Sequence, residues 1–257
     1  MPIHIIDLSY APQNTQAATL SDWFTDMLRR DGVLGLINHG IDYDLLAQKQ
    51  LYDEQLFSLP DLVQYKLNLD QIGKMGGYYC EPDKYDDTRH MWHVLQDPAH
   101  NYTPEKLLDF IPLSIKLLHQ YKRLLYRLLG LIEESLRLTE KTLRNLADDA
   151  IPMLNSFECY QKADIPNPPQ FRVDEHTDRG LLTIMPIPHE PGYEAYIGEC
   201  WTPVLAEEFP PHTLLIHGGR TLQRTTGIKP CNHRVVWAAG KRRVNSLFGV
   251  RFTTAEE

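Results

Sequence analysis

The chain has 257 residues, of which 42% are hydrophobic and 23% charged, and its formal net charge is -8. This length and composition are typical of a globular protein with one large domain or two small ones. An acidic chain without a block of lysine or arginine is a poor candidate for binding nucleic acid or an anionic membrane surface, and we expect neither.

The four cysteines are far apart and form no C-x-x-C pair. Such spacing argues against a disulfide framework and favours reduced thiols. The first ten residues lack the charged-then-apolar pattern of a signal peptide, and no apolar run approaches the length of a membrane span. We therefore expect a cytoplasmic protein.

The first 150 residues are predicted to be mainly helical. Ser21 is the expected N-cap of the first helix, and Gly32 ends it because glycine adopts the left-handed conformation without strain. An aromatic-rich stretch, residues 72–93, is predicted to be irregular, and the alternatives are a pocket-lining segment and a surface loop with packed tyrosines. Apolar periodicity indicates helices at 21–30, 43–56, 104–138 and 143–150, and apolar runs indicate strands at 3–8 and 33–40.

Beyond residue 150 the pattern changes to short strand-like runs punctuated by proline and glycine. Many short strands at regular spacing are typical of a β-sandwich or a barrel such as a jelly roll. No linker separates the two parts, so we expect one α+β domain over residues 1–257, with a helical part at 1–150 and a jelly-roll part at 151–257. The predicted strands are 154–160, 181–186, 193–197, 214–217, 233–238 and 246–252.

A candidate metal site begins with His176 and Asp178. In an extended strand, residues two apart point to the same side, so this imidazole and this carboxylate can converge on one point. One histidine and one carboxylate are two thirds of a 2-His-1-carboxylate iron site. The candidate third ligand is His233, which begins a later strand-like run. The alternative third ligands are His189, His212 and His217.

Arg243 follows His233 by ten residues, on the next predicted strand. An arginine there is suited to hold a carboxylate in a fork of two hydrogen bonds.

These residues together give the chain a resemblance to Fe(II)/2-oxoglutarate-dependent dioxygenases of the isopenicillin N synthase-like group. The metal motif is His176-Thr177-Asp178, and the approach to the second histidine is residues 222–227. Residues 35–41, GLINHGI, are close to the group's xxVINHGI, and residues 56–60 with Lys66 resemble its FFxLPxxxK. The family fold is a distorted jelly roll, or double-stranded β-helix, with supporting helices.

The resemblance implies that the three ligands hold Fe(II), and that 2-oxoglutarate and O2 occupy its open positions. The far carboxylate of 2-oxoglutarate would bind Arg243, with Asn245 and Asn155 as further co-substrate contacts. Hydroxylation of a small organic substrate is the default outcome, and desaturation or ring closure are variants. A carboxylate at Asp178 argues against halogenation, because related halogenases have a small residue there.

Two departures from the family pattern fall on the co-substrate anchors. The family's Arg-x-Ser is Arg243-Val244-Asn245 here, and its Asn-x-Tyr is Asn155-Ser156-Phe157. The alternatives are therefore an iron oxidase of the same fold that does not use 2-oxoglutarate, and a non-catalytic binding protein on this fold. By position, Tyr79, Arg89, His90, Trp92 and His93 resemble the family's substrate-lining segment. Arg179 is a further candidate substrate contact, because it follows the metal carboxylate where the family often has a small residue. An anionic substrate such as an amino acid or peptide would bind one of Arg89, Arg179 and Arg220.

Overall fold

The computed structural model of the protein describes residues 3–9, 19–82, 88–139, 141–160, 170–236 and 242–252, and their side chains except those of residues 81, 82, 88, 89, 159 and 160. Its strands form a major sheet of eight strands and a minor sheet of four. In spatial order, the major sheet comprises β1 (Ile5–Asp7), β2 (Val33–Ile37), β10 (Leu214–Gly218), β7 (Leu182–Pro186), β12 (Arg242–Arg251), β5 (Ile151–Tyr160), β4 (Thr88–Leu95) and β3 (Gly77–Pro82). The minor sheet comprises β6 (Phe171–Thr177), β11 (Asn232–Val236), β8 (Tyr193–Ile197) and β9 (Cys200–Pro203).

The expected mixture of helices and large sheets is confirmed, but the N-terminal part is less helical than predicted. It supplies four strands to the major sheet, and two of them, β3 and β4, lie in the stretch that we predicted to be irregular. The prediction was wrong because glycines and charges obscure the alternation there, whereas the pairing of β4 with β5 stabilises both strands. The sequence also did not predict β6, β9 or the short helix α5 (Arg220–Thr226).

Helix α1 (Leu20–Asp31) begins one residue before the expected position. Thr19, not Ser21, is the N-cap, and it forms a reciprocal capping box with Asp22. Ser21 lies inside the helix and donates a hydrogen bond to Glu134. Gly32 ends the helix with φ 71°, as expected, and a Cβ there would lie 3.1 Å from the backbone of Cys231.

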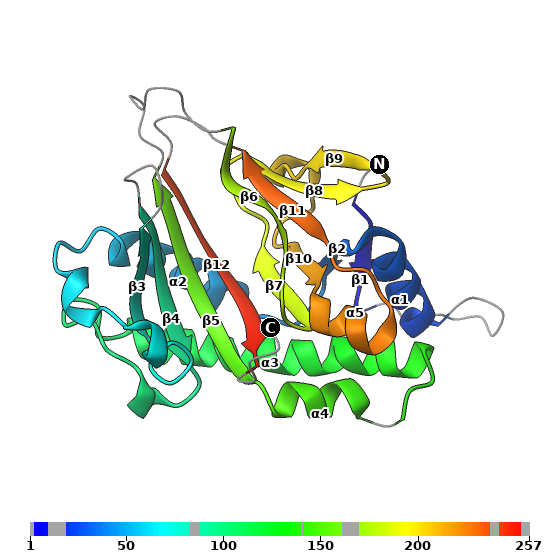
Figure 1. The fold of residues 1–257 in the computed structure, drawn as a ribbon, viewed down its shortest axis with the longest axis horizontal. Helices are drawn as coiled ribbons and strands as arrows, with labels where there is room; N and C mark the ends of the chain where they lie inside the picture. The colour runs from blue at the N-terminus through cyan, green and yellow to red at the C-terminus, as the bar shows by residue number, and fades with distance from the viewer. Residues whose placement is uncertain are drawn as a thin grey trace.

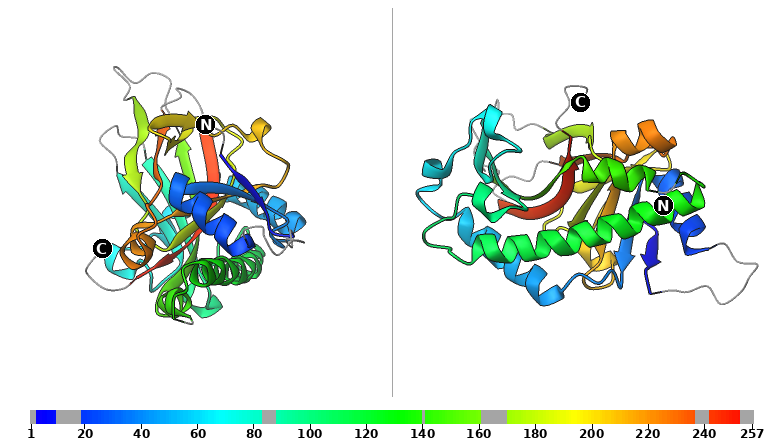
Figure 2. Two further views of the ribbon diagram at one scale, coloured as in Figure 1. Left: turned by 90° about the vertical axis from the view of Figure 1, so that its right-hand side faces the viewer. Right: turned by 90° about the horizontal axis from the view of Figure 1, so that it is seen from below.

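Helix α3 (Phe110–Ser135) supports the major sheet. Its apolar stripe is buried, and the ring of Tyr121 stacks on that of Phe248 from β12 at a centroid distance of 5.5 Å. It runs beneath the sheets beside α4 (Thr142–Asp148) in Figure 1, and the view from below in Figure 2 shows it crossing the molecule. Helix α2 (Tyr43–Leu56) packs against α3 and β12. Within the described residues, none of the helices combines the length and apolar character of a membrane span.

The alternation of side chains along β12 separates two environments. Phe248 faces the helices, whereas Arg243, Asn245 and Leu247 face a cavity between the two sheets. Strand β5 pairs with β12 so that Phe157 lies opposite Asn245. The two sheets thus enclose a cavity whose walls come from distant parts of the chain.

Candidate metal centre

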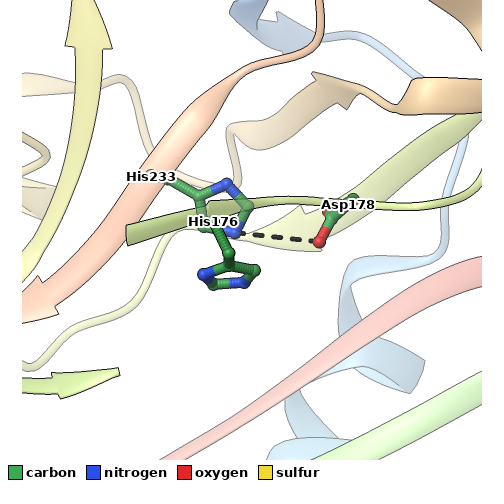
Figure 3. A group of neighbouring side chains, drawn as sticks. All are labelled: His176, Asp178 and His233. Atoms are coloured by element: carbon green, nitrogen blue, oxygen red, sulfur yellow. Dashed lines mark ion pairs between the residues drawn. The ribbon is translucent and has the colours of Figure 1, made fainter. Parts of the chain in front are cut away.

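The three predicted ligands meet on the minor sheet. His176 on β6 and His233 on β11 are directly opposed in the antiparallel register, so their side chains lie on the same face. Asp178 follows β6 by one residue. One ligand atom from each residue lies within 4.8 Å of the others, and Figure 3 shows the two rings and the carboxylate converging.

Both histidine rings are oriented by a hydrogen bond from Nδ1 to the backbone carbonyl oxygen two residues earlier in the chain. The Nδ1 atom of His176 lies 2.9 Å from the carbonyl oxygen of Asp174, and that of His233 lies 3.2 Å from the carbonyl oxygen of Cys231. A carbonyl oxygen only accepts hydrogen bonds, so each Nδ1 carries a proton, and in the neutral ring the free lone pair is on Nε2. Two bare Nε2 atoms beside a carboxylate are the donor set that a divalent transition metal binds.

Asp178 is held by its neighbours. Thr183 donates a hydrogen bond of 2.5 Å to its Oδ2, and Nε2 of His233 lies 3.8 Å from its Oδ1. Burial works against ionisation, but the attraction of His217 and His233 and the bond from Thr183 outweigh it and hold the pKa of this carboxyl well below its ordinary value. Asp178 is therefore an anion at neutral pH.

His233 is neutral at neutral pH. Burial, together with the nearby His217, lowers its pKa to about 4. A neutral imidazole is the form that ligates a metal, because a protonated ring has no free lone pair.

His217, the strongest rival ligand, lies behind Asp178. It is fully buried, its Nδ1 is 3.8 Å from Oδ2 of Asp178, and its Nε2 forms a hydrogen bond of 2.8 Å with the hydroxyl of Tyr193. It contacts Asp178 but is not one of the three residues whose ligand atoms lie within 4.8 Å of one another. His189 and His212 both line a separate cavity beside α2.

A cavity of about 380 Å³ opens at the three residues. Arg243 and Asn245 line it, as does Phe157, whereas Asn155 accepts a hydrogen bond from Nδ1 of His93 (2.6 Å) and lies outside it. Wall residues that the sequence did not reveal as site residues are Met91, Val173, Thr183, Met185, Tyr193, Val235 and Leu247.

The predicted substrate residues are only partly near this cavity. Trp92 is fully buried against Phe110 in the core, and His90, on the same side of β4, bonds through Nδ1 to the hydroxyl of Tyr78. Neither residue lies in the wall of this cavity, because the alternation of β4 directs Met91, rather than its two neighbours, into it.

Three other predicted substrate residues have different positions. Tyr79 packs on His93 at a ring distance of 6.2 Å and is not a wall residue of the cavity. The side chain of Arg89 lies outside the described residues. Arg179 lines a neighbouring cavity that includes Asp178.

No family model matches the sequence. The chain is 24% identical over 225 residues to the Arabidopsis thaliana protein named "Probable flavonol synthase 5", a match that covers 83% of this chain and 66% of that protein. It superimposes with a TM-score of 0.77 on a dioxygenase for auxin oxidation from Arabidopsis thaliana in complex with 2-oxoglutarate, at 18% identity and covering 100% of this chain and 95% of that one. The chain is therefore similar in sequence to curated 2-oxoglutarate-dependent dioxygenases and shares the fold of solved ones.

A second solved structure with this fold is a Neurospora crassa protein crystallised with α-ketoglutarate and thymine. It superimposes with a TM-score of 0.80 at 18% identity, covering 97% of this chain and 85% of that one. The chain thus spans about two thirds of the curated relative and most of both solved structures.

Proposed function

We propose that this protein is a mononuclear non-haem Fe(II) oxygenase in which His176, Asp178 and His233 hold the iron. The observation that carries the proposal is the convergence of two imidazoles, each with its Nδ1 bonded to a backbone carbonyl, and one carboxylate at the wall of a cavity. A 2-His-1-carboxylate set leaves three adjacent coordination positions open for reactants.

Arg243 is the proposed anchor for the far carboxylate of 2-oxoglutarate. Its side chain is 7% exposed, lines the same cavity and lies 6.0 Å above the ring of Tyr193. Asn245 assists it, because its Oδ1 accepts a hydrogen bond from the backbone N–H of Ser246 (2.9 Å) and its amide NH2 is then directed elsewhere as a donor. Asn155, which is bound to His93, orients the wall rather than the co-substrate.

Bound Fe(II) and 2-oxoglutarate would supply the oxidising chemistry, coupling decarboxylation of the keto acid to oxidation of a substrate by O2. The chain's own contribution is to position the reactants and to exclude water, since Met91, Val173, Met185 and Leu247 make much of the wall apolar. The substrate is a small organic molecule, and hydroxylation is the default outcome, with desaturation or ring closure as variants.

This proposal includes one domain over residues 1–257 with a distorted double-stranded β-helix at its centre. The major and minor sheets supply the two walls of the cavity, which supports that arrangement. In such a domain the helices act as scaffold, and the metal centre belongs to the C-terminal part.

The test is an anaerobic titration of the protein with Fe(II) and then with 2-oxoglutarate. Chelation of the iron by the keto acid should give a weak visible band near roughly 500 nm, as expected for this type of site. The Arg243→Gln variant should bind iron as well as the native protein does but need more 2-oxoglutarate to develop the band. Iron binding without any band at saturating 2-oxoglutarate would contradict the use of this co-substrate.

A second candidate function is an iron oxidase that draws all electrons from its substrate. Phe157 favours it, because this residue faces the cavity opposite Asn245 without the hydroxyl of the family's Asn-x-Tyr motif. In that case Arg243 would hold a carboxylate of the substrate, and O2 consumption would not depend on 2-oxoglutarate.

A further inference from the structure

A second cavity, of about 240 Å³, lies beside the metal centre and shares Asp178 and Thr183 with it. Two arginines line this cavity: Arg179, from the turn after β6, and Arg251, the last residue of β12. The remaining wall residues are uncharged: Gly180, Leu182, Gly249 and Val250.

The turn that carries Arg179 is fixed by the start of α5. Thr221 donates two hydrogen bonds to the carbonyl oxygen of Arg179, from its backbone N–H (3.0 Å) and its hydroxyl (2.9 Å). Gly180 lets the turn approach the end of β12, because a Cβ there would lie 3.0 Å from the carbonyl oxygen of Val250. Arg179 is therefore held close to Arg251 by backbone contacts.

Arg251 is positioned from the opposite side. Its backbone pairs with Ile151 of β5, and its Cδ would lie 3.4 Å from a Cβ on Gly73, so the stem packs over that glycine. Gly73 has φ 84°, which disfavours other residues there. Burial lowers the pKa of His93, and the charge of Arg251 adds to this effect, so this exposed arginine lies near His93 at the end of the sheet.

The carboxylate of Asp178 is also in this wall, but it is paired with His217 and His233, each at 3.8 Å, rather than with either arginine. In the part of the chain that the structure describes, no carboxylate lies within ion-pair distance of Arg179 or Arg251. A Cβ on Gly249 would meet no atom within 4 Å, so the space beside them is open. Two positive charges at one cavity repel each other, and an anion between them turns this repulsion into attraction.

We propose that Arg179 and Arg251 bind a carboxylate of the substrate, and so direct an adjacent carbon of that molecule toward the metal ligands. This inference rests on the proposed function, since it places the substrate relative to the iron. The planar guanidinium fork matches a carboxylate in two parallel hydrogen bonds, which favours a carboxylic acid over a neutral substrate. Arg243 lines the larger cavity, not this one, so the substrate acid and 2-oxoglutarate have separate anchors.

The experiment uses protein loaded anaerobically with Fe(II) and 2-oxoglutarate, and measures binding by calorimetry. The probes are phenylacetate and cyclohexylacetate, each matched by its neutral amide, together with phenyl phosphate. The visible band of the loaded protein is recorded first on every sample. The variants are Arg179→Gln, Arg251→Gln and, as a matched control, Arg220→Gln, whose side chain is exposed and absent from the wall of this cavity.

We expect at least one acid to bind the native protein more tightly than its amide. Each of Arg179→Gln and Arg251→Gln should weaken that binding by about tenfold or more, the effect of losing one charge-assisted hydrogen bond, and Arg220→Gln should change it less than about twofold. The affinity for 2-oxoglutarate should be unchanged in all three variants.

Three results would overturn the inference: no binding of either acid, equal binding of acid and amide, or loss of 2-oxoglutarate affinity in Arg179→Gln or Arg251→Gln. Tighter binding of phenyl phosphate than of either acid would replace the carboxylate by a phosphate ester and overturn the stated class. A sample that binds iron but gives no band would instead count against the proposed function, so the two failures are distinguishable.

Discussion

Replacing Thr183 with valine removes one hydrogen bond from a metal ligand and leaves the shape of the side chain unchanged. The threonine hydroxyl donates to Oδ2 of Asp178 at 2.5 Å, and the residue is 7% exposed. Without this donor, the carboxylate loses the contact that fixes its rotation toward His176 and His233. We therefore expect Thr183→Val to weaken Fe(II) binding while the protein remains folded.

The magnitude follows from the charge on the acceptor. A hydrogen bond to a charged group contributes about 1.5–3 kcal/mol, and loss of such a partner of a metal ligand typically lowers metal affinity by roughly 10- to 100-fold. The side chain of Asp178 is 25% exposed and still has His217 at 3.8 Å, so water and that imidazole replace part of the lost interaction. The expected decrease is therefore at the lower end, about tenfold.

The assay is anaerobic calorimetric titration with Fe(II), with Mn(II) as an oxygen-stable substitute. Thr213→Val is the matched control, because Thr213 is also a buried threonine but donates to the carbonyl oxygen of Pro210, away from the metal ligands. A decrease smaller than about twofold in Thr183→Val, or an equal decrease in both variants, would refute the reasoning about Asp178.

Three further predictions concern stability, pH and the co-substrate. Lys49→Met should lower the free energy of unfolding in urea by about 3–5 kcal/mol. Lys49 is fully buried with Asp53 and Ser156, so its loss leaves the buried carboxylate of Asp53 without a positive partner. If the double variant with Asp53→Leu were no more stable than Lys49→Met alone, this reason would be contradicted. The metal-free protein should lose about 3 kcal/mol of unfolding free energy as the pH falls from 6.5 to 4. In this range the unfolded chain binds a proton at His233, whose ordinary pKa is 6.5, whereas the folded chain does not until the pH reaches about 4. A His233→Gln variant with the same pH dependence would disprove that assignment. Phe157→Tyr should tighten 2-oxoglutarate binding by about 2- to 10-fold, the effect of one added hydrogen bond, as measured by the visible band, and unchanged or weaker binding would show that position 157 does not contact the co-substrate.

The sequence predicted those parts of the site that depend on local spacing. His176 and Asp178 are two residues apart in an extended segment, which is enough to place them on one side. The pairing of His233 with His176 depends on strands 57 residues apart, and spacing alone left His217 as a rival. The structure separates the two histidines by their partners, because Nε2 of His217 is bound to Tyr193 whereas that of His233 lies toward the carboxylate of Asp178.

The substrate side was harder to predict because it depends on which face of a strand meets the cavity. Met91 and Trp92 are adjacent in sequence, but only the methionine lines the cavity, whereas the tryptophan packs in the core. The aromatic character of residues 72–93 indicated a pocket but gave no register for β3 and β4. Arg251 carried no local signal at all, since its proximity to Arg179 arises from the contact between Gly180 and Val250.

The most direct test of the metal centre is a crystal structure grown anaerobically with Mn(II) and 2-oxoglutarate, with the metal located by its anomalous scattering. We predict a single strong peak within coordination distance of Nε2 of His176, the carboxylate of Asp178 and Nε2 of His233, with the far carboxylate of 2-oxoglutarate on Arg243. A metal bound at His217, or crystals without a peak at these three residues, would contradict the account.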